Sequence, residues 1–127
     1  MAGTGQPPLG IAAHEAAAVI FREADDRQGE AMAVNNLAVA LRQSGRLDEA
    51  IGAHEQAAAL FRETGDRRFE GAAISSLGVA LYEVGRLDEA VAAHETALSI
   101  FQEVGDRHAE GGTMTNLATL RAALPEG

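Results

Sequence analysis

The sequence contains no cysteine, lysine or tryptophan, and only one tyrosine and four phenylalanines. Without cysteine there is no disulfide framework, no thiol nucleophile and no thiolate ligand for a metal. All ten basic residues are arginines, against 19 acidic residues, so the formal net charge is −9. This charge disfavours nucleic acid as a partner, because a phosphate backbone requires a basic binding face. It disfavours an anionic membrane surface for the same reason.

Long apolar runs are also missing. No stretch reaches the roughly 20 residues that span a bilayer, and residues 1–10 lack the basic and then apolar pattern of a secretory signal. We therefore expect a cytoplasmic protein. The length of 127 residues fits one modest domain. Residues 1–8, which include two glycines and two prolines, are expected to form a flexible leader.

The strongest feature of the sequence is an internal repeat of 40 residues. Residues 11–50 and 51–90 are identical at 23 of 40 positions, and Gly-Arg-Leu-Asp-Glu-Ala occurs at 45–50 and again at 85–90. Ala-His-Glu, Phe and Asp-Arg each recur three times in one register, without an insertion. Self-similarity at periods of about 20 to 50 residues is typical of solenoids. The sequence therefore indicates three stacked copies of one structural unit.

Each unit contains two amphipathic patterns separated by a short turn. In residues 66–84 the apolar side chains recur at spacings of three and four, which predicts a helix. Asp66 is its predicted N-cap, and Gly85 is predicted to end it in the left-handed conformation. A second helix is expected to begin near Leu87 and to end at Gly105. The short turn forces an antiparallel hairpin, and stacked hairpins bury a continuous core.

These residues resemble the tetratricopeptide repeat family. The first helix of that family carries an apolar residue, then Leu-Gly, then a large residue, which matches Ile74, Leu77-Gly78 and Leu81 here. The usual repeat has about 34 residues. Repeats of 40 residues are similar to those of kinesin light chain and of bacterial signalling and regulatory proteins. The resemblance covers residues 9–124.

The resemblance implies an all-α fold, an α-solenoid of antiparallel helical hairpins with six helices in a right-handed superhelical stack. We expect one domain over residues 9–124. It would consist of a half repeat at 9–24, full repeats at 27–64 and 67–104, and a half repeat at 107–124. Ala38, Gly78 and Ala118 share one register, and their small side chains are expected to let helices approach within about 8–10 Å.

The resemblance also implies a concave groove, lined by the first helix of each unit, that binds a peptide or a helix. Polar positions that vary between units on this helix are candidates for recognition, because the repeated positions serve packing. The candidates are Asn35, Asn36, Val39, Arg42, Ser75, Ser76, Val79, Tyr82, Thr115, Asn116 and Thr119. The alternative is that they are ordinary solvated helix residues without a ligand.

Within this set, Asn36 and Asn116 resemble the asparagines with which the family clamps an extended peptide, since an amide side chain both donates and accepts. The form of the clamp that reads a C-terminal carboxylate needs basic residues. Arg42 is the one basic side chain among the candidates, which argues against that form.

No metal, cofactor or catalytic site is expected. His14, His54 and His94 share a register, but equivalent positions in stacked helices lie about 10 Å apart. They cannot share a zinc ion, whose bonds to nitrogen are about 2.1 Å long. We interpret them as packing histidines with a hydrogen-bonded ring nitrogen. The sequence shows no nucleophile–base pair and no phosphate loop, so we expect no enzyme.

The two ends of the array are a second candidate surface. Apolar residues there are expected to lack a covering helix and to be available for self-association. These residues are Ile11, Ile20, Leu117, Leu120 and Leu124. Either the chain is a fragment of a longer protein, or the ends pair with another copy. Unlike ends would build a filament, and like ends would give a closed dimer.

Two functional interpretations follow. The leading one is a protein–protein interaction scaffold that binds a peptide or helix in its groove, as a module of a larger regulatory protein. The alternative is a self-association module that pairs through its end helices.

Overall fold

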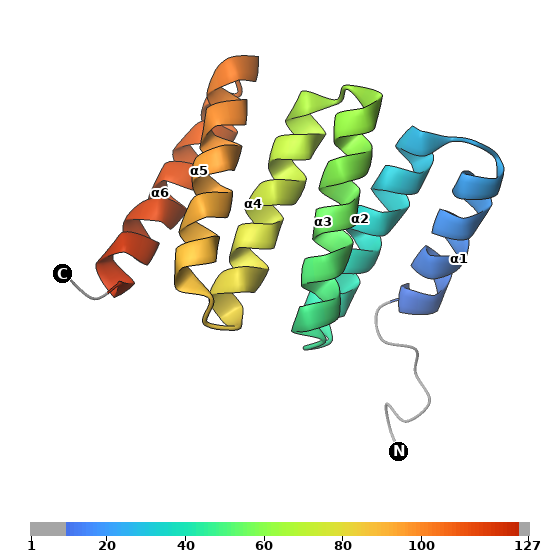
Figure 1. Cartoon of the computed structure of the whole chain (residues 1–127), viewed down its shortest axis with the longest axis horizontal. Coiled ribbons are helices and arrows are strands. Elements are labelled where there is room, and N and C mark those ends of the chain that lie inside the picture. Colours follow the sequence, from blue (N-terminus) through green and yellow to red (C-terminus); the bar gives the residue numbers. More distant parts are fainter. Residues whose placement is uncertain (1–9, 125–127) are drawn as a thin grey trace.

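The computed structural model describes residues 10–124, and these residues form six α-helices and no strand (Figure 1). The helices are α1 (Ile11–Glu23), α2 (Arg27–Gln43), α3 (Leu47–Thr64), α4 (Arg67–Glu83), α5 (Leu87–Val104) and α6 (Arg107–Ala123). The predicted all-α helical repeat fold is confirmed. The leader predicted at residues 1–8 lies outside the described residues.

The helices stand side by side in chain order, with α1 and α6 at opposite ends of the row (Figure 1). Each helix packs against its neighbours in the sequence, and α4 also contacts α6. We call α2, α4 and α6 the first helices, because they begin the sequence pattern of a unit, and α1, α3 and α5 the second helices. The contact of α4 with α6 brings two first helices together on one side of the stack.

Local sequence signals fix the helix ends. The side chains of Asp26, Asp66 and Asp106 cap the first helices, and Asp66 accepts a hydrogen bond of 3.2 Å from the amide of Phe69. The predicted start of a second helix at Leu87 and its end at Gly105 are also observed. Gly85 has a φ of 86°, which is left-handed, as its place after α4 predicts. These caps satisfy backbone groups that a helix leaves unpaired.

The core lies between first and second helices, and it depends on close approach. A β-carbon on Gly71 of α4 would lie 2.9 Å from Cε1 of Phe101 and 3.0 Å from Cγ2 of Ile100, both on α5. Phe61 and Phe101 are buried in successive units. Small residues on the first helices therefore admit the large side chains of the second helices, which is how an alanine-rich chain fills its interior.

Two buried carboxylates join successive units, one between α1 and α2 and one between α3 and α4. Glu70 is only 2% exposed, and its two oxygens each lie 2.9 Å from an arginine, Arg62 of α3 and Arg67 of α4. One unit earlier, Glu30 pairs in the same way with Arg22 of α1 and Arg27 of α2. A carboxylate removed from water needs such charged donors to offset its desolvation.

Candidate functional site

A groove of about 540 Å³ runs between α4 and α6. Both helices contribute small or polar side chains to it, and α5 contributes one phenylalanine. The lining residues are Ala72, Ser75, Ser76, Val79, Phe101, Ala109, Gly112, Thr113, Thr115 and Asn116. Because α4 and α6 are both first helices, this groove lies on the side of the stack where the sequence predicted one.

A smaller cavity of about 150 Å³ adjoins the groove. Its lining residues are Val79, Tyr82, His94, Asn116, Thr119 and Leu120. Val79 and Asn116 line both spaces, so the groove and the cavity meet at these two side chains. Asn116 therefore stands at the junction, where its amide can donate to one ligand group and accept from another.

The structure brings seven of the candidate residues together around these two spaces. They are Ser75, Ser76, Val79, Tyr82, Thr115, Asn116 and Thr119. The four candidates on α2 line neither space. They are Asn35, Asn36, Val39 and Arg42.

Two of the four α2 candidates are engaged within the fold. Oδ1 of Asn35 lies 3.2 Å from Nδ1 of His54, so this amide is used to hold a buried ring. Nη1 of Arg42 lies 3.4 Å from Oε1 of Glu83 on α4, and this pairing offsets the arginine charge. Asn36 is exposed on the surface of α2. The α2 portion of the predicted groove is thus less available to a ligand than the portion between α4 and α6.

The lining of the two spaces is uncharged and combines apolar with polar side chains. Among the described residues around them, the polar groups are hydroxyls, one amide and one imidazole. The hydroxyl of Thr119 donates to the carbonyl oxygen of Thr115 at 3.1 Å, and its own oxygen can still accept. Such a surface can hydrogen bond a neutral peptide backbone, and it offers no cation to an anionic ligand.

Two stretches of the sequence match a family model. Residues 2–63 and residues 71–108 each match a model described as tetratricopeptide repeat. The chain belongs to the tetratricopeptide repeat family. Tetratricopeptide repeats form protein–protein interaction scaffolds, and members of the family are generally non-enzymatic. No curated protein matches the sequence.

Solved structures share this tetratricopeptide fold at low sequence identity. BtubC (BKLC) from P. vanneervenii superposes with a TM-score of 0.63 at 20% identity, over 92% of this chain and 59% of that one. A protein described as a kinesin light chain with nearly identical TPR-like repeats, from Podospora anserina, has a TM-score of 0.64 at 17% identity, over 91% of this chain and 67% of that one. The chain therefore spans less than two thirds of the length of BtubC.

The tetratricopeptide stack holds two of its three register-matched histidines in the interior. His54 and His94 are buried, whereas His14 on α1 is half-buried. Burial, and secondly the charge of Arg42, lower the pKa of His54 to about 4. Burial also lowers the pKa of His94. Both rings are therefore neutral at pH 7.

The expected hydrogen bond to a ring nitrogen is found for His54 but not for His94. Nδ1 of His94 has no partner among the described residues. The reason is the side chain in the register of Asn35, which is Ser75 in the next unit and is too short to reach the ring. Residues 10–124 contain no group of three or more His, Asp or Glu side chains placed to hold a metal ion. No helix in this range is long and apolar enough to cross a membrane.

Several lining residues were not among the groove candidates of the sequence, although one of them, Leu120, was a candidate for self-association. Ala72, Ala109 and Gly112 open the groove because they are small, and Phe101 and Leu120 supply apolar surface. One position of the repeat indicates this space in the sequence. Met32 in the first unit is replaced by Ala72 in the second and Gly112 in the third, so space at this position grows towards α6.

The expected exposure of the end residues is wrong for three of the five. Ile11, Leu117 and Leu120 are buried, because these sides of α1 and α6 face the neighbouring helices α2 and α5. Leu120 shares its register with Ala40 and Ala80, which are buried in the earlier units. Leu124 is half-buried where α6 ends. Ile20 is exposed, at 62%.

Proposed function

We propose that this protein is an interaction scaffold that binds an extended peptide segment of another protein in the groove between α4 and α6, as a cytoplasmic module of a larger regulatory protein. One observation carries the proposal. Seven of the eleven candidate side chains, those on α4 and α6, gather around two adjoining spaces. Variation at packing positions would weaken the stack, whereas variation at a binding surface sets specificity.

The chemistry of the lining supports a peptide ligand. The amide of Asn116 and the nearby hydroxyls of Ser76 and Thr115 suit the alternating donors and acceptors of an extended backbone. The smaller cavity adds apolar walls from Val79 and Leu120 beside the tyrosine ring of Tyr82. A peptide that lies in the groove could place one apolar side chain there, since binding pockets combine apolar walls with a few polar groups.

The charge distribution supports a neutral or basic segment over an acidic one. No formal charge lies on the described residues that line the groove, whereas the chain as a whole carries −9. A field of this sign attracts positively charged segments and repels acidic ones at long range. Arg42, the one basic candidate, is paired with Glu83. This pairing supports recognition of an internal peptide segment and not of a free C-terminal carboxylate.

A library selection with a groove-filling variant tests the proposal. A random peptide library displayed on phage would be selected against the immobilised chain, and the affinities of the selected peptides would be measured by fluorescence anisotropy. Gly112 lines the groove, and a β-carbon added there would meet no atom of another helix within 4 Å, so the ring of Gly112→Phe should occupy part of the groove. We expect it to weaken the selected peptides at least tenfold, roughly, because it occupies their site.

The matched control is Gly52→Phe. Gly52 is an exposed helical glycine on α3 that lines neither space. A β-carbon added there would also meet no atom of another helix within 4 Å. Peptide affinity should be unchanged in this variant. The proposal fails if the library yields no binder, or if Gly112→Phe and Gly52→Phe bind the selected peptides equally well.

A further inference from the structure

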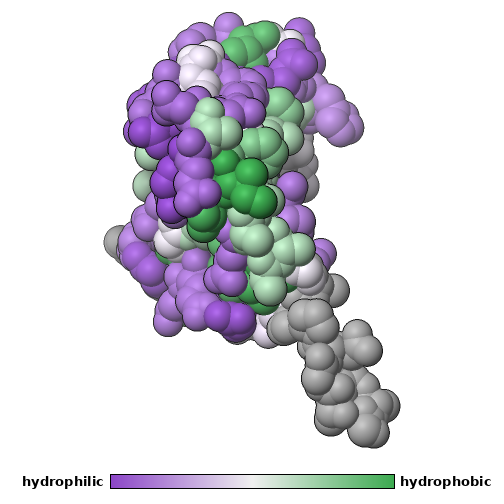
Figure 2. Space-filling model, turned by 90° about the vertical axis from the view of Figure 1, so that its right-hand side faces the viewer, coloured by the Kyte–Doolittle hydropathy of each residue, from purple (hydrophilic) through white to green (hydrophobic). Residues whose placement is uncertain are grey.

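The outer face of α1 is exposed where its equivalents are buried. Ile20 is 62% exposed, whereas Leu60 and Ile100 at the same register of α3 and α5 are 5% and 3% exposed. In α5 the cover comes from the preceding first helix, because Ile100 and Phe101 lie against Gly71 of α4. Figure 2 looks onto the α1 end and shows hydrophobic residues in the middle of this face, bordered by hydrophilic ones. Among the described residues, no first helix precedes α1.

The outer face of α6, at the other end of the stack, is likewise exposed where its equivalents on α2 and α4 are buried. Met114 is 54% exposed, whereas Val34 and Ile74 at the same register of α2 and α4 are 2% and 7% exposed. α2 and α4 pack against the second helices that follow them, and on α4 the nearby residues Gly71 and Gly78 lie against α5. α6 has no following second helix among the described residues. The chain thus carries both halves of one interface, one at each end.

The residues on the two outer faces correspond to those that pack together in the α4–α5 contact. There, Gly71 and Gly78 of α4 leave room for Phe101 and His94 of α5. The residues in the registers of these two glycines on α6 are Gly111 and Ala118, which are both small and exposed. A β-carbon added at Gly111 would meet no atom of another helix within 4 Å, so the space beside this residue is open. The registers of Phe101 and His94 on α1 hold Phe21 and His14, both only half-buried.

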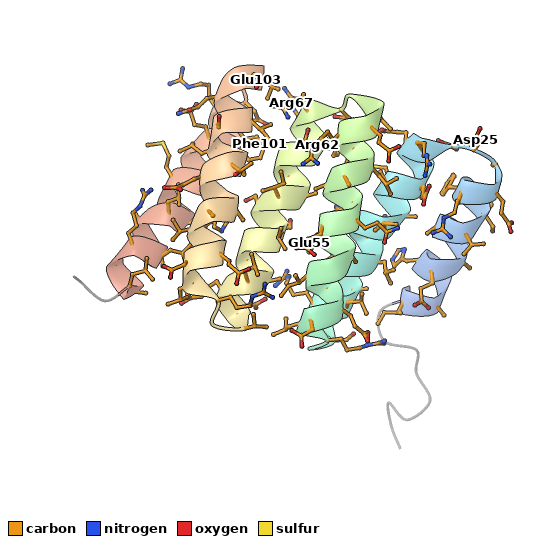
Figure 3. All side chains as sticks on the ribbon, in the orientation of Figure 1. Asp25, Glu55, Arg62, Arg67, Phe101 and Glu103 are labelled. Carbon is orange, nitrogen blue, oxygen red and sulfur yellow. The ribbon has the colours of Figure 1, made fainter. Side chains whose placement is uncertain are left out.

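The charges of the two ends match in the same registers. An arginine near the start of a first helix pairs with a glutamate near the end of the following second helix. Arg67 and Glu103 do so at 2.8 Å, and Figure 3 shows these two side chains together at the ends of α4 and α5. On α6 this arginine is Arg107, whose side chain is 89% exposed, and on α1 the glutamate is Glu23, which is also exposed.

A second polar contact between units repeats this relationship. The side chain next to that arginine reaches the capping aspartate of the next first helix. Gln28 donates to Asp66 at 2.9 Å, and Arg68 lies 3.6 Å from Asp106. The third member of the donor register is His108 on α6, and the first member of the acceptor register is Asp26, which caps α2. Both are exposed.

We infer that α6 of one copy docks against α1 of a second copy and continues the stack head to tail. The contact reproduces the α4–α5 interface already present within the chain, with Met114, Gly111 and Ala118 of one copy against Ile20, Phe21 and His14 of the next. Arg107 pairs with Glu23, and His108 donates to Asp26, across this contact. Because the two surfaces differ, the contact is heterologous, and each added copy leaves one α1 face and one α6 face free for further growth.

Two single variants and their mixture test this geometry. Molar mass would be measured by light scattering over a concentration series of the chain. The wild-type mass should rise above 13.2 kDa towards multiples of it as concentration increases. Ile20→Glu blocks the α1 face and Met114→Glu blocks the α6 face, so each variant alone should stay monomeric at concentrations where the wild type associates. Met32→Glu is the matched control, because Met32 is exposed on α2 and lies on neither end face.

The mixture separates head-to-tail from symmetric pairing. The Ile20→Glu copy keeps an intact α6 face and the Met114→Glu copy keeps an intact α1 face, so an equimolar mixture should form a 1:1 dimer and nothing larger. A wild type that is monomeric throughout the series overturns the proposal, as does a Met114→Glu variant that still dimerises. Arg107→Glu and Glu23→Arg should each weaken association, and the double variant should restore it. These residues do not line the groove, so peptide binding should be unaffected.

Discussion

Gly78 of α4 lies so close to the ring of His94 on α5 that a β-carbon at position 78 would come within 2.6 Å of Nε2. His94 is buried, so any side chain at position 78 would have to displace this ring or move the helix. The preceding unit accommodates Ala38 in the same register beside His54, whose ring is held by Asn35. The α4–α5 contact therefore depends on the glycine, and the α2–α3 contact does not.

Gly78→Leu should consequently destabilise the protein. A leucine side chain at this position must push α4 and α5 apart or displace the buried ring. Overpacking of this kind typically costs about 1–3 kcal/mol in the free energy of unfolding. Urea denaturation followed by circular dichroism measures the loss. Gly52→Leu is the control, because that helical glycine faces open space and leucine is the better helix former by up to about 1 kcal/mol. Equal stability of the two variants would show that the Gly78–His94 contact is wrong.

Acid should destabilise the fold through His54. Its pKa is about 4 in the folded protein, against an ordinary value of 6.5. Above pH 6.5 the ring is neutral in both states, so the stability is complete. Between pH 6.5 and 4 only the unfolded chain binds the proton, and stability falls by about 1.4 kcal/mol per pH unit, up to roughly 3 kcal/mol. The lowered pKa of His94 acts in the same direction.

Denaturation at a series of pH values measures this slope. The variant His54→Asn loses the titrating group, so its unfolding free energy should fall less steeply between pH 6.5 and 4. NMR of the folded wild type gives a second readout, in which the ring of His54 should remain neutral at pH 5. An unchanged slope in His54→Asn, or a ring that is already charged at pH 5, would contradict the burial of this side chain.

The helices could be predicted from the sequence because their signals are local. A capping aspartate such as Asp66 and a left-handed glycine such as Gly85 act within one turn, and both are found where expected. The 40-residue repeat then fixes the order of the helices. Asp25 also fits this logic, since it adopts a φ of 61° in the register where later units have Gly65 and Gly105.

The site was less predictable because it depends on contacts between units. Repetition identified the varying residues, but it did not show that Asn35 turns inward to His54, or that Arg42 is paired with Glu83. The prediction for the ends is wrong for a related reason. The repeat pattern predicts that Leu117 faces outwards, whereas its side chain is buried in the stack.

The buried carboxylate of Glu70 should contribute more to stability than a surface one. Both of its oxygens accept from arginines, and only 2% of the side chain is exposed. Glu70→Gln removes the charge and leaves amide hydrogens facing arginine donors, so we expect a loss of about 1–3 kcal/mol. Glu49 pairs with Arg46 on the surface of α3 and provides the control. Glu49→Gln should cost less than about 1 kcal/mol. Similar losses in both variants would remove any special role for the buried ion pairs.

Asn116 and Asn36 occupy the same register, yet they should differ in their effect on peptide binding. Asn116 stands where the groove meets the smaller cavity, whereas Asn36 is exposed on α2 and lines neither space. For a peptide selected against the chain, Asn116→Ala should weaken binding by about two- to tenfold, which corresponds to one or two lost hydrogen bonds of ordinary strength. Asn36→Ala should weaken it less, and only for a peptide long enough to reach α2. Anisotropy titrations measure both affinities, and circular dichroism shows whether each variant keeps its helices. If Asn36→Ala causes the larger loss, the ligand lies along α2 and not between α4 and α6.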